Sequence, residues 1–347
     1  MRTEGGWPAS TTNTGGYDQR VHQVTRPASE SEADVLALWG AVSKTVDLDG
    51  PVHYLDFGGP ADGPRVVLVH GLGGSHVNWS LLGPLLAERA RVLAIDLPGF
   101  GRTPPQGRPM TVHANANLLD RFVREVAGAP AILVGNSMGG MISIMESAAN
   151  PDTVAGVILV DPALPRAAGA APDRLVATAF FLYAVPGLGE LYLARRRAKF
   201  PAEVLVRQTL ELCCVDPSRV PADVIAASVA LVQERSQQQG LDGAFLRTAR
   251  SVLRLLARPT PYWEMMSSLR VPVYLFHGEQ DRLVPVQAAR IAAGRYPRWT
   301  FATFPDAGHV PQLEVPDAMA KLLLEWFAGA GQPAVAAASR PPRLLRS

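Results

Sequence analysis

Residues 131–140 read Ala-Ile-Leu-Val-Gly-Asn-Ser-Met-Gly-Gly, a short apolar run that ends in closely spaced glycines around one serine, Ser137. A run of this length bounded by glycine is typical of a parallel strand covered on both faces, and residues 141–145, which are apolar except for Ser143, continue it as a buried helix. Gly135 and Gly139 have no Cβ, so the strand and the helix can approach closely. We therefore predict a strained turn that points the Ser137 hydroxyl out of the sheet.

A serine in such a turn is a candidate nucleophile. The backbone N–H of Met138 lies at the predicted helix N-terminus, where unpaired donors and the helix dipole stabilise a developing oxyanion. The bare pattern G-x-S-x-G also occurs by chance, and an ordinary strand-to-helix turn with a capping serine is the competing interpretation. The flanking strand and helix favour the functional interpretation.

Composition limits the class of protein. A chain of 347 residues with 48% hydrophobic residues can bury a large core, and a net charge of +2 gives no indication of a nucleic-acid partner. The two cysteines, Cys213 and Cys214, are adjacent, which excludes a disulfide framework and fits a reducing compartment. Residues 1–30 contain no apolar signal segment. We expect a cytoplasmic protein with a disordered leader over 1–30.

The rest of the chain predicts alternating strands and helices, and therefore a largely parallel sheet. The pattern is interrupted between 162 and 269, where only helical segments are recognised. The predicted layout is core over 31–161, a helical insertion over 162–269, core over 270–329 and a disordered tail over 330–347. Predicted strands lie at 52–57 and 65–70, paired as a hairpin, and at 91–96, 156–161, 272–277 and 300–304; predicted helices lie at 31–42, 115–126, 286–293 and 317–327.

The glycine-rich loop at 70–75, His-Gly-Leu-Gly-Gly-Ser, follows a buried strand directly. Such a loop can hold phosphate, but the G-K-[ST] and G-x-G-x-x-G patterns are missing, so an oxyanion loop fits better. No metal-ligand spacing is present, and we predict neither a metal nor another cofactor.

A serine hydroxyl needs a base within hydrogen-bond reach, and the base needs an orienting carboxylate. In a parallel sheet reactive groups gather at the carboxyl ends of the strands. Asp281 and His309 each follow a predicted strand, and the chain order serine, acid, histidine is the order found in α/β-hydrolases. Asp161 also ends a strand and is the alternative acid.

The remaining titratable candidates have simpler explanations. We expect His70 to shape its loop and His277 to be a buried strand-end residue, and Glu279 to be a solvated neighbour of Asp281. His53, His76 and His113 lie in no recognised motif, and we assign them no role.

Five motifs together resemble the α/β-hydrolase superfamily over about residues 50–328. They are the oxyanion loop 70–75 with Asn78-Trp79, the D-x-P-G-x-G turn at 96–101, the serine elbow 135–140, the acid loop 277–281 and the histidine loop 306–309. The resemblance implies an α/β-hydrolase fold with a helical cap formed by the insertion. It also implies a Ser137-His309-Asp281 triad and oxyanion-hole N–H groups from Leu72 and Met138.

The insertion bears on the substrate. Residues 175–185 are apolar and include Phe180, Phe181 and Tyr183, followed by three arginines at 195–197. The run is too short to span a bilayer, so we expect these aromatic residues to roof a substrate pocket, with peripheral membrane contact as the alternative. Arginines 247, 250, 254 and 258 recur at helical spacing and form either a solvated stripe or a site for an anion or membrane.

We therefore predict a serine hydrolase that cleaves a carboxylic ester of a hydrophobic substrate through an acyl-enzyme. A carbon–carbon bond hydrolase of a ring-cleavage product is the closest alternative, because the elbow also resembles that group. Gly74 and Val310 depart from it, since those enzymes favour a G-x-G-P-G loop and a tryptophan after the histidine. A related perhydrolase or acyltransferase and a slow-turnover protein that binds a small ligand remain further alternatives.

Overall fold

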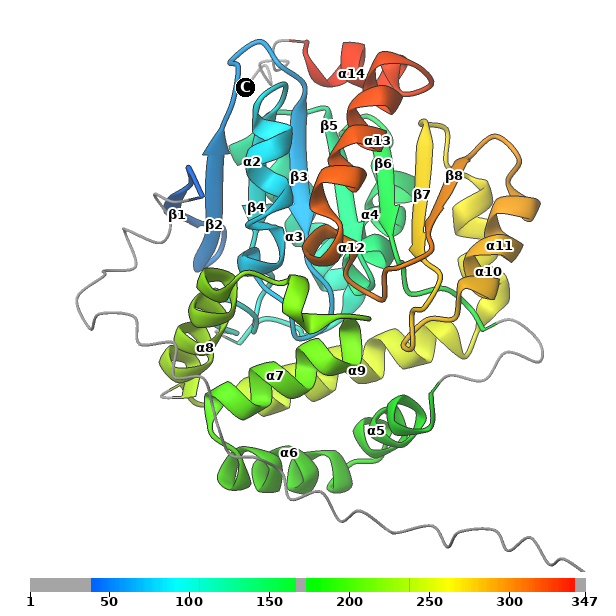
Figure 1. The fold of residues 1–347 in the computed structure, drawn as a ribbon. Coiled ribbons are helices and arrows are strands. Elements are labelled where there is room, and N and C mark those ends of the chain that lie inside the picture. The colour runs from blue at the N-terminus through cyan, green and yellow to red at the C-terminus, as the bar shows by residue number, and fades with distance from the viewer. Residues whose placement is uncertain (1–38, 106, 167–172, 237, 341–347) are drawn as a thin grey trace, which may run out of the picture. The chain divides into compact units, whose positions relative to one another are not determined.

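The central strand β5 (Ala131–Asn136) is fully buried along its length, as its apolar sequence predicts. It lies in one eight-stranded sheet of order β1-β2-β4-β3-β5-β6-β7-β8 in the computed structural model (Figure 1). Pairs from β4 through β8 are parallel, whereas β1–β2 and β2–β4 are antiparallel. The other strands are β1 (Val42–Asp47), β2 (Pro51–Gly58), β3 (Arg65–Val69), β4 (Arg91–Ile95), β6 (Val154–Val160), β7 (Val273–Gly278) and β8 (Thr300–Phe304).

The structure describes residues 39–105, 107–166, 173–236 and 238–340. By its internal contacts the chain divides into two units, Met1–Glu30 and Ser31–Ser347, and all the described residues belong to the second. The predicted disordered leader therefore lies outside the described residues.

Side chains alternate along the strands between two hydrophobic clusters, one on each face of the sheet. Val66 and Leu68 of β3 pack on one face, and Val67 and Val69 pack on the other. This period of two places helices over both faces, as expected for a parallel sheet. The helices are η1 (His76–Trp79), α2 (Leu82–Ala87), α3 (Val112–Phe122), η2 (Val123–Ala127), α4 (Met138–Ala149), α5 (Arg174–Ala184), α6 (Leu188–Lys199), α7 (Ala202–Cys213), η3 (Pro217–Arg219), α8 (Ala222–Ser236), α9 (Leu241–Leu256), α10 (Pro259–Ser267), α11 (Val286–Arg295), α12 (Pro311–Glu314), α13 (Pro316–Ala328) and α14 (Gln332–Ala338).

The residues between β6 and β7 form α5 to α10, and Figure 1 shows α5 to α9 together beyond one end of the sheet. Contacts identify this as the carboxyl end of the strands. Arg235 of α8 donates to the carbonyl of Gly99 in the loop after β4, at 2.7 Å. The backbone N–H of His309, which follows β8, donates to the Cys213 carbonyl at the end of α7, at 2.6 Å. The insertion thus touches the loop that carries the candidate base His309 and the loop after β4.

The structure corrects two expectations about strands and helices in the first part of the chain. The strands predicted as a hairpin are not neighbours, because β4 lies between β2 and β3. The helix predicted over 31–42 lies partly outside the described residues, and its last residue, Val42, instead begins the strand β1. Antiparallel pairing with β2 accounts for that strand, since Val42 and Thr45 are β-branched and fit a pleated edge.

The tail predicted as disordered from residue 330 forms the helix α14. Ala334 and Ala338 are fully buried, and a Cβ placed on Gly156 of β6 would lie only 2.7 Å from the Ala334 methyl group. Small side chains thus let α14 pack closely on the sheet, which composition alone does not indicate. Residues 341–347 lie outside the described part of the chain.

Candidate active site

Ser137 occupies the turn between β5 and α4 with φ 54° and ψ −115°. A non-glycine residue with positive φ is strained and is held there by its surroundings. A Cβ on Gly135 would lie 2.4 Å from the Gly139 carbonyl oxygen, and one on Gly139 would lie 2.0 Å from the Val69 carbonyl oxygen. The two glycines therefore allow the close contact of β3, β5 and α4 that fixes the serine turn.

The glycine-rich loop after β3 lies against this serine. A Cβ on Gly71 would be 3.0 Å from the Ser137 Cβ, so Leu72 follows a residue in direct contact with the elbow. Met138 is the first residue of α4, and the first N–H groups of a helix have no partner within the helix. Both predicted oxyanion donors thus belong to segments beside Ser137.

His70, at the start of the same loop, is fixed as the neutral tautomer by its partners. Its Nε2 accepts a hydrogen bond from the Leu97 N–H at 3.0 Å, so its Nδ1–H donates to the Gly71 carbonyl at 2.8 Å. Burial lowers the pKa of His70 to about 4, although the nearby Asp96 acts in the opposite direction. His70 shapes the loop, as predicted.

The predicted acid and base lie together. Nδ1 of His309 is 2.7 Å from Oδ2 of Asp281, and both residues are buried. The other oxygen of Asp281 accepts hydrogen bonds from the N–H groups of Leu283 and Val284, at 2.7 and 3.0 Å. Burial opposes ionisation of Asp281, but His309 outweighs it and holds the pKa of Asp281 below its ordinary value. The pair is therefore an ionised carboxylate that orients an imidazole.

Asn136, beside the serine, connects this pair to the elbow. Its side-chain amide donates to the carbonyls of His309, at 3.0 Å, and Val160, at 3.1 Å. A Cβ on Gly278 would lie 2.0 Å from the Gly308 carbonyl, so the acid and histidine loops are also in close contact. The loops after β5, β7 and β8 thus meet at one place. The role of Asn136 was missed at the sequence level, although the residue lies inside the elbow motif.

Glu314, which the sequence did not single out, supports the histidine loop from behind. It accepts hydrogen bonds from the N–H groups of Gly308 and Val215, each at 2.6 Å. Cys213 lies two residues before Val215 in the chain. Its thiol is not a rival nucleophile, because burial raises the pKa of the thiol to about 12.

The alternative acid, Asp161, lies behind the acid loop. Its Oδ1 accepts a hydrogen bond from the Gly278 N–H at 2.8 Å, and its Oδ2 has no hydrogen-bond partner among the described residues. Burial and the charge of Asp281 raise the pKa of Asp161 well above its ordinary value. His277 is fully buried and its Nε2 donates to the Val284 carbonyl at 2.8 Å, so it is a strand-end core residue that supports the same loop.

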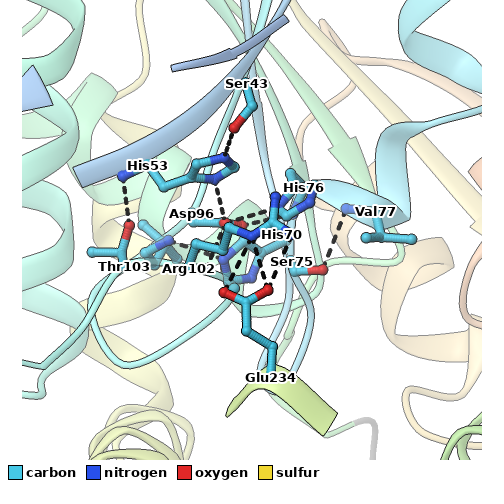
Figure 2. A network of polar contacts seen from close by, with 12 residues as sticks. Ser43, His53, His70, Ser75, His76, Val77, Asp96, Arg102, Thr103 and Glu234 are labelled. Carbon is cyan, nitrogen blue, oxygen red and sulfur yellow. Dashed lines mark hydrogen bonds and ion pairs between the residues drawn. The ribbon is translucent and has the colours of Figure 1, made fainter. Parts of the chain in front are cut away.

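Asp96, which opens the D-x-P-G-x-G turn, is the centre of a second buried network (Figure 2). Its Oδ2 lies 2.7 Å from Nδ1 of both His53 and His76 and accepts the Arg102 N–H at 2.8 Å. Burial raises the pKa of Asp96, but the two histidines outweigh it and hold the pKa well below its ordinary value. The Arg102 guanidinium binds Glu234 of α8 at 3.0 Å, so this network connects the turn to the insertion.

Two buried groups bring three possible metal-ligand atoms within 4.8 Å of one another: His53 with His76 and Asp96, and Asp161 with His277 and Asp281. In the first group the contacts at 2.7 Å are hydrogen bonds that a metal would have to replace. In the second, Asp281 already binds His309. Hydrogen bonding therefore accounts for the first group. In the second it accounts for Asp281 and for Nε2 of His277, whereas Oδ2 of Asp161 and Nδ1 of His277 have no hydrogen-bond partner among the described residues.

The aromatic residues predicted to roof the pocket divide between two faces of α5. Tyr183 packs edge-on against Phe245 of α9 at 5.1 Å, and Phe180 packs on Tyr183 at 6.0 Å. Phe181 is 63% exposed, and the helical period points it away from Tyr183, so it lies outside the cluster that Phe180 and Tyr183 form. Phe245 was missed; a Cβ on Gly73 would lie 3.3 Å from its ring, so Phe245 reaches the oxyanion loop.

A sequence profile described as "Alpha/beta hydrolase family" matches residues 66–322, which include the elbow, the acid loop and the histidine loop. The chain belongs to this family. The hydrolase is 29% identical to the magnesium-chelatase 30 kDa subunit of Rhodobacter capsulatus, over 78% of this chain and 89% of that protein. It is 30% identical to the pimeloyl-[acyl-carrier protein] methyl ester esterase of Aromatoleum aromaticum, over 75% of this chain and 96% of the esterase.

Among solved structures, the hydrolase resembles the 2-hydroxy-6-oxo-6-phenylhexa-2,4-dienoate hydrolase of Rhodococcus sp. strain RHA1. The TM-score is 0.66, the identity is 23%, and the match covers 83% of this chain and 99% of that one. At this identity the likeness shows the shared fold.

Proposed function

We propose that this hydrolase cleaves a carboxylic ester with a hydrophobic acyl group through an acyl-enzyme on Ser137. The observation that carries the proposal is the Asp281–His309 hydrogen bond, at 2.7 Å, held beside the serine turn by Asn136. Because Nδ1 of His309 faces the carboxylate, Nε2 is the nitrogen left to accept the serine proton. The named ester specificity of the Aromatoleum relative supports ester chemistry.

The reaction has two halves. Ser137 Oγ attacks the acyl carbon while Nε2 of His309 takes its proton, and the N–H groups of Leu72 and Met138 stabilise the oxyanion. His309 then protonates the leaving alcohol as its bond to the acyl carbon breaks. Water, deprotonated by His309, attacks the acyl carbon, and His309 returns that proton to Ser137 Oγ as its bond to the acyl carbon breaks, which releases the carboxylic acid and free Ser137.

The hydrophobic part of the proposal depends on the aromatic cluster. Phe245, Tyr183 and Phe180 supply apolar surface next to the oxyanion loop and few hydrogen-bond donors. We propose that the insertion acts as a cap and that this cluster contacts the acyl chain.

The test is labelling with a fluorophosphonate, which reacts with an activated serine. We expect wild-type protein to be labelled at Ser137 and to hydrolyse p-nitrophenyl esters. Ser137→Ala should lose labelling and at least about 10³-fold in kcat, because removal of a triad group costs several powers of ten. The fold should be unchanged by circular dichroism. Labelling of the variant at another residue would exclude Ser137 as the nucleophile.

The same assay distinguishes ester hydrolysis from the alternative functions. A ring-cleavage dienoate is offered beside the esters, and turnover of the dienoate with no ester hydrolysis would favour carbon–carbon bond cleavage. Stoichiometric labelling without turnover of either substrate would favour a ligand-binding protein. We expect ester turnover to dominate, since Gly74 and Val310 depart from the carbon–carbon hydrolase pattern.

A further inference from the structure

The outer face of α5 and α6 exposes an unusual concentration of apolar side chains. Seven large hydrophobic residues are exposed in the described part of the chain, and four of them lie on these two helices. Their exposed fractions are 70% for Leu175, 63% for Phe181, 44% for Leu188 and 46% for Leu191. Single exposed apolar residues need no explanation, whereas a gathered set marks an interaction surface. These four residues define the outer apolar face.

The inner faces of both helices are already used for packing on α9. Val176 and Gly189 are buried, and a Cβ on Gly189 would lie 2.9 Å from Leu246 of α9. By the helical period Phe181 and Leu191 lie on the side opposite these buried residues, whereas Leu175 and Leu188 lie roughly 100° from them, on the flank of each helix. Figure 1 shows α5 and α6 at the end of the insertion farthest from the sheet. Packing among the residues that the structure describes therefore does not account for these exposed apolar side chains.

No single helix among the described residues is long and apolar enough to cross a membrane. Helices α5 and α6 reach that length and hydropathy only together, and they bend by 118° at the break between them. Two apolar helices joined by such a bend can both lie flat on one surface and turn their exposed apolar side chains towards it.

The charges around the outer apolar face are basic. Residues 173–199 contain five basic and two acidic side chains, a net charge of +3. Both acidic residues are already paired: Asp173 binds Arg282 at 2.8 Å, and Glu190 binds Arg250 at 3.0 Å. Arg197 is paired as well, with Asp242, so the excess positive charge of this surface comes from Arg174, Arg195, Arg196 and Lys199.

Arginines of α9 extend this positive surface beside the α5–α6 turn. A hollow of about 550 Å³ is lined by Pro186 of that turn and by Arg247, Arg250 and Arg254. Arg247 and Arg254 are exposed, and neither forms an ion pair with a described residue. Their guanidinium groups are available to phosphate oxygens, which Arg binds in bidentate fashion.

We propose that the outer apolar face and its arginines dock this hydrolase on the surface of an anionic phospholipid bilayer. Apolar side chains would enter the headgroup boundary, and Arg247 and Arg254 would contact lipid phosphates. Charge favours lipid over a second copy of the chain, because a two-fold pair would place the same arginines against each other. The proposal is independent of the proposed chemistry, so binding is tested without turnover.

The experiment is cosedimentation of the full chain carrying Ser137→Ala with vesicles of phosphatidylcholine and phosphatidylglycerol in equal parts. We expect binding that weakens in high salt and on pure phosphatidylcholine vesicles. Adding Arg247→Gln and Arg254→Gln should lower the partition constant about thirtyfold, since each basic residue near the surface contributes about 1 kcal/mol. Adding Leu175→Ser and Leu191→Ser should lower it about tenfold or more.

The matched controls are Arg89→Gln with Arg298→Gln and, for the apolar change, Ile291→Ser, all at exposed positions outside α5, α6 and α9. They should leave vesicle binding unchanged. In an otherwise wild-type chain, both pairs of docking variants should keep wild-type activity on a soluble short ester, which also shows that they fold. Absence of binding to anionic vesicles at low salt, or equal loss in the controls, overturns the proposal. A wild-type dimer that the leucine variants convert to monomers would assign the face to a second copy instead.

Discussion

At the residue scale, two buried carboxyl groups, Asp161 and Asp281, lie close to the histidines of the candidate site, but of these two only Asp281 hydrogen-bonds His309, the proposed base. Asp281 contacts Nδ1 of His309 and is held ionised, whereas Asp161 accepts a hydrogen bond from Gly278 and has a raised pKa. We predict that Asp281→Asn lowers kcat for ester hydrolysis by about 10⁴, because the imidazole loses its orienting charge. Asp161→Asn should cost far less. Steady-state kinetics of both variants decide the assignment, and a reversed ranking would make Asp161 the acid.

His70 should make the fold sensitive to acid. Its pKa is lowered by burial from 6.5 to about 4, so between these values the unfolded chain binds a proton that the folded chain does not. The stabilisation is full above about pH 6.5 and is lost as the pH falls towards 4, by up to about 3 kcal/mol. His70→Gln, whose carbonyl can still accept the Leu97 N–H, should flatten this part of the pH profile. Urea unfolding of both proteins from pH 7 to 4 measures the difference, and parallel profiles would contradict it.

Candidate site residues that lie within a recognised motif could be predicted from the sequence. Residues whose place in the site depends on a partner far away in the chain could not. Ser137, Asp281 and His309 could be proposed as candidates because each follows a predicted strand in a recognised loop. His53 and His76 lie in no motif, and their common partner Asp96 is 43 and 20 positions away. Phe245 was missed for the same reason, because its contact with Gly73 joins α9 to the loop after β3.

At the scale of elements, the elbow depends on backbone contact between β3 and α4. We predict that Gly139→Ala destabilises the protein by several kcal/mol, because the new methyl group would lie 2.0 Å from the Val69 carbonyl oxygen, which belongs to the central sheet. Gly294→Ala in α11 is the control. No atom lies within 4 Å of its position, so it should be neutral or stabilise the helix by up to about 1 kcal/mol. Chemical denaturation measures both; equal stability of the two variants would exclude close packing as the reason for Gly139.

Buried strands and amphipathic helices were predictable because their periods are strong over several residues. The strand predicted at 300–304 and the helix predicted at 317–327 agree closely with β8 and α13. The pairing of strands was not predictable in the same way. The short connection between β2 and β3 indicates a hairpin, but the insertion of β4 between them depends on contacts with later residues. Edge strand β1 and helix α14 likewise form through tertiary packing.

At the scale of the whole described unit, the order of motifs predicted which loops meet, and the structure adds how the insertion holds them. Arg235 of α8 donates to the loop after β4, and Cys213 at the end of α7 accepts from His309. Both contacts use backbone groups of the core, which no side-chain pattern reveals. The insertion therefore contacts both the candidate histidine loop and the loop after β4, and we expect it to help position them.

The division of α5 into an inner and an outer face yields the last prediction. If the inner cluster of Phe180, Tyr183 and Phe245 contacts the acyl chain, each added methylene should contribute up to about 0.8 kcal/mol, or about fourfold in kcat/KM. The increase should stop once the chain covers the apolar surface of the cluster. Phe245→Ala should flatten this increase across a series of p-nitrophenyl esters and change the shortest ester little, since the oxyanion donors belong to the core. Phe181→Ala is the matched control: the side chain is the same, but it is 63% exposed on the opposite face, so the chain-length profile should stay as in the wild type. A profile flattened by Phe181→Ala and unchanged by Phe245→Ala would mean that the acyl chain binds on the outer side of α5. That result would contradict the proposed contact between the acyl chain and the inner cluster.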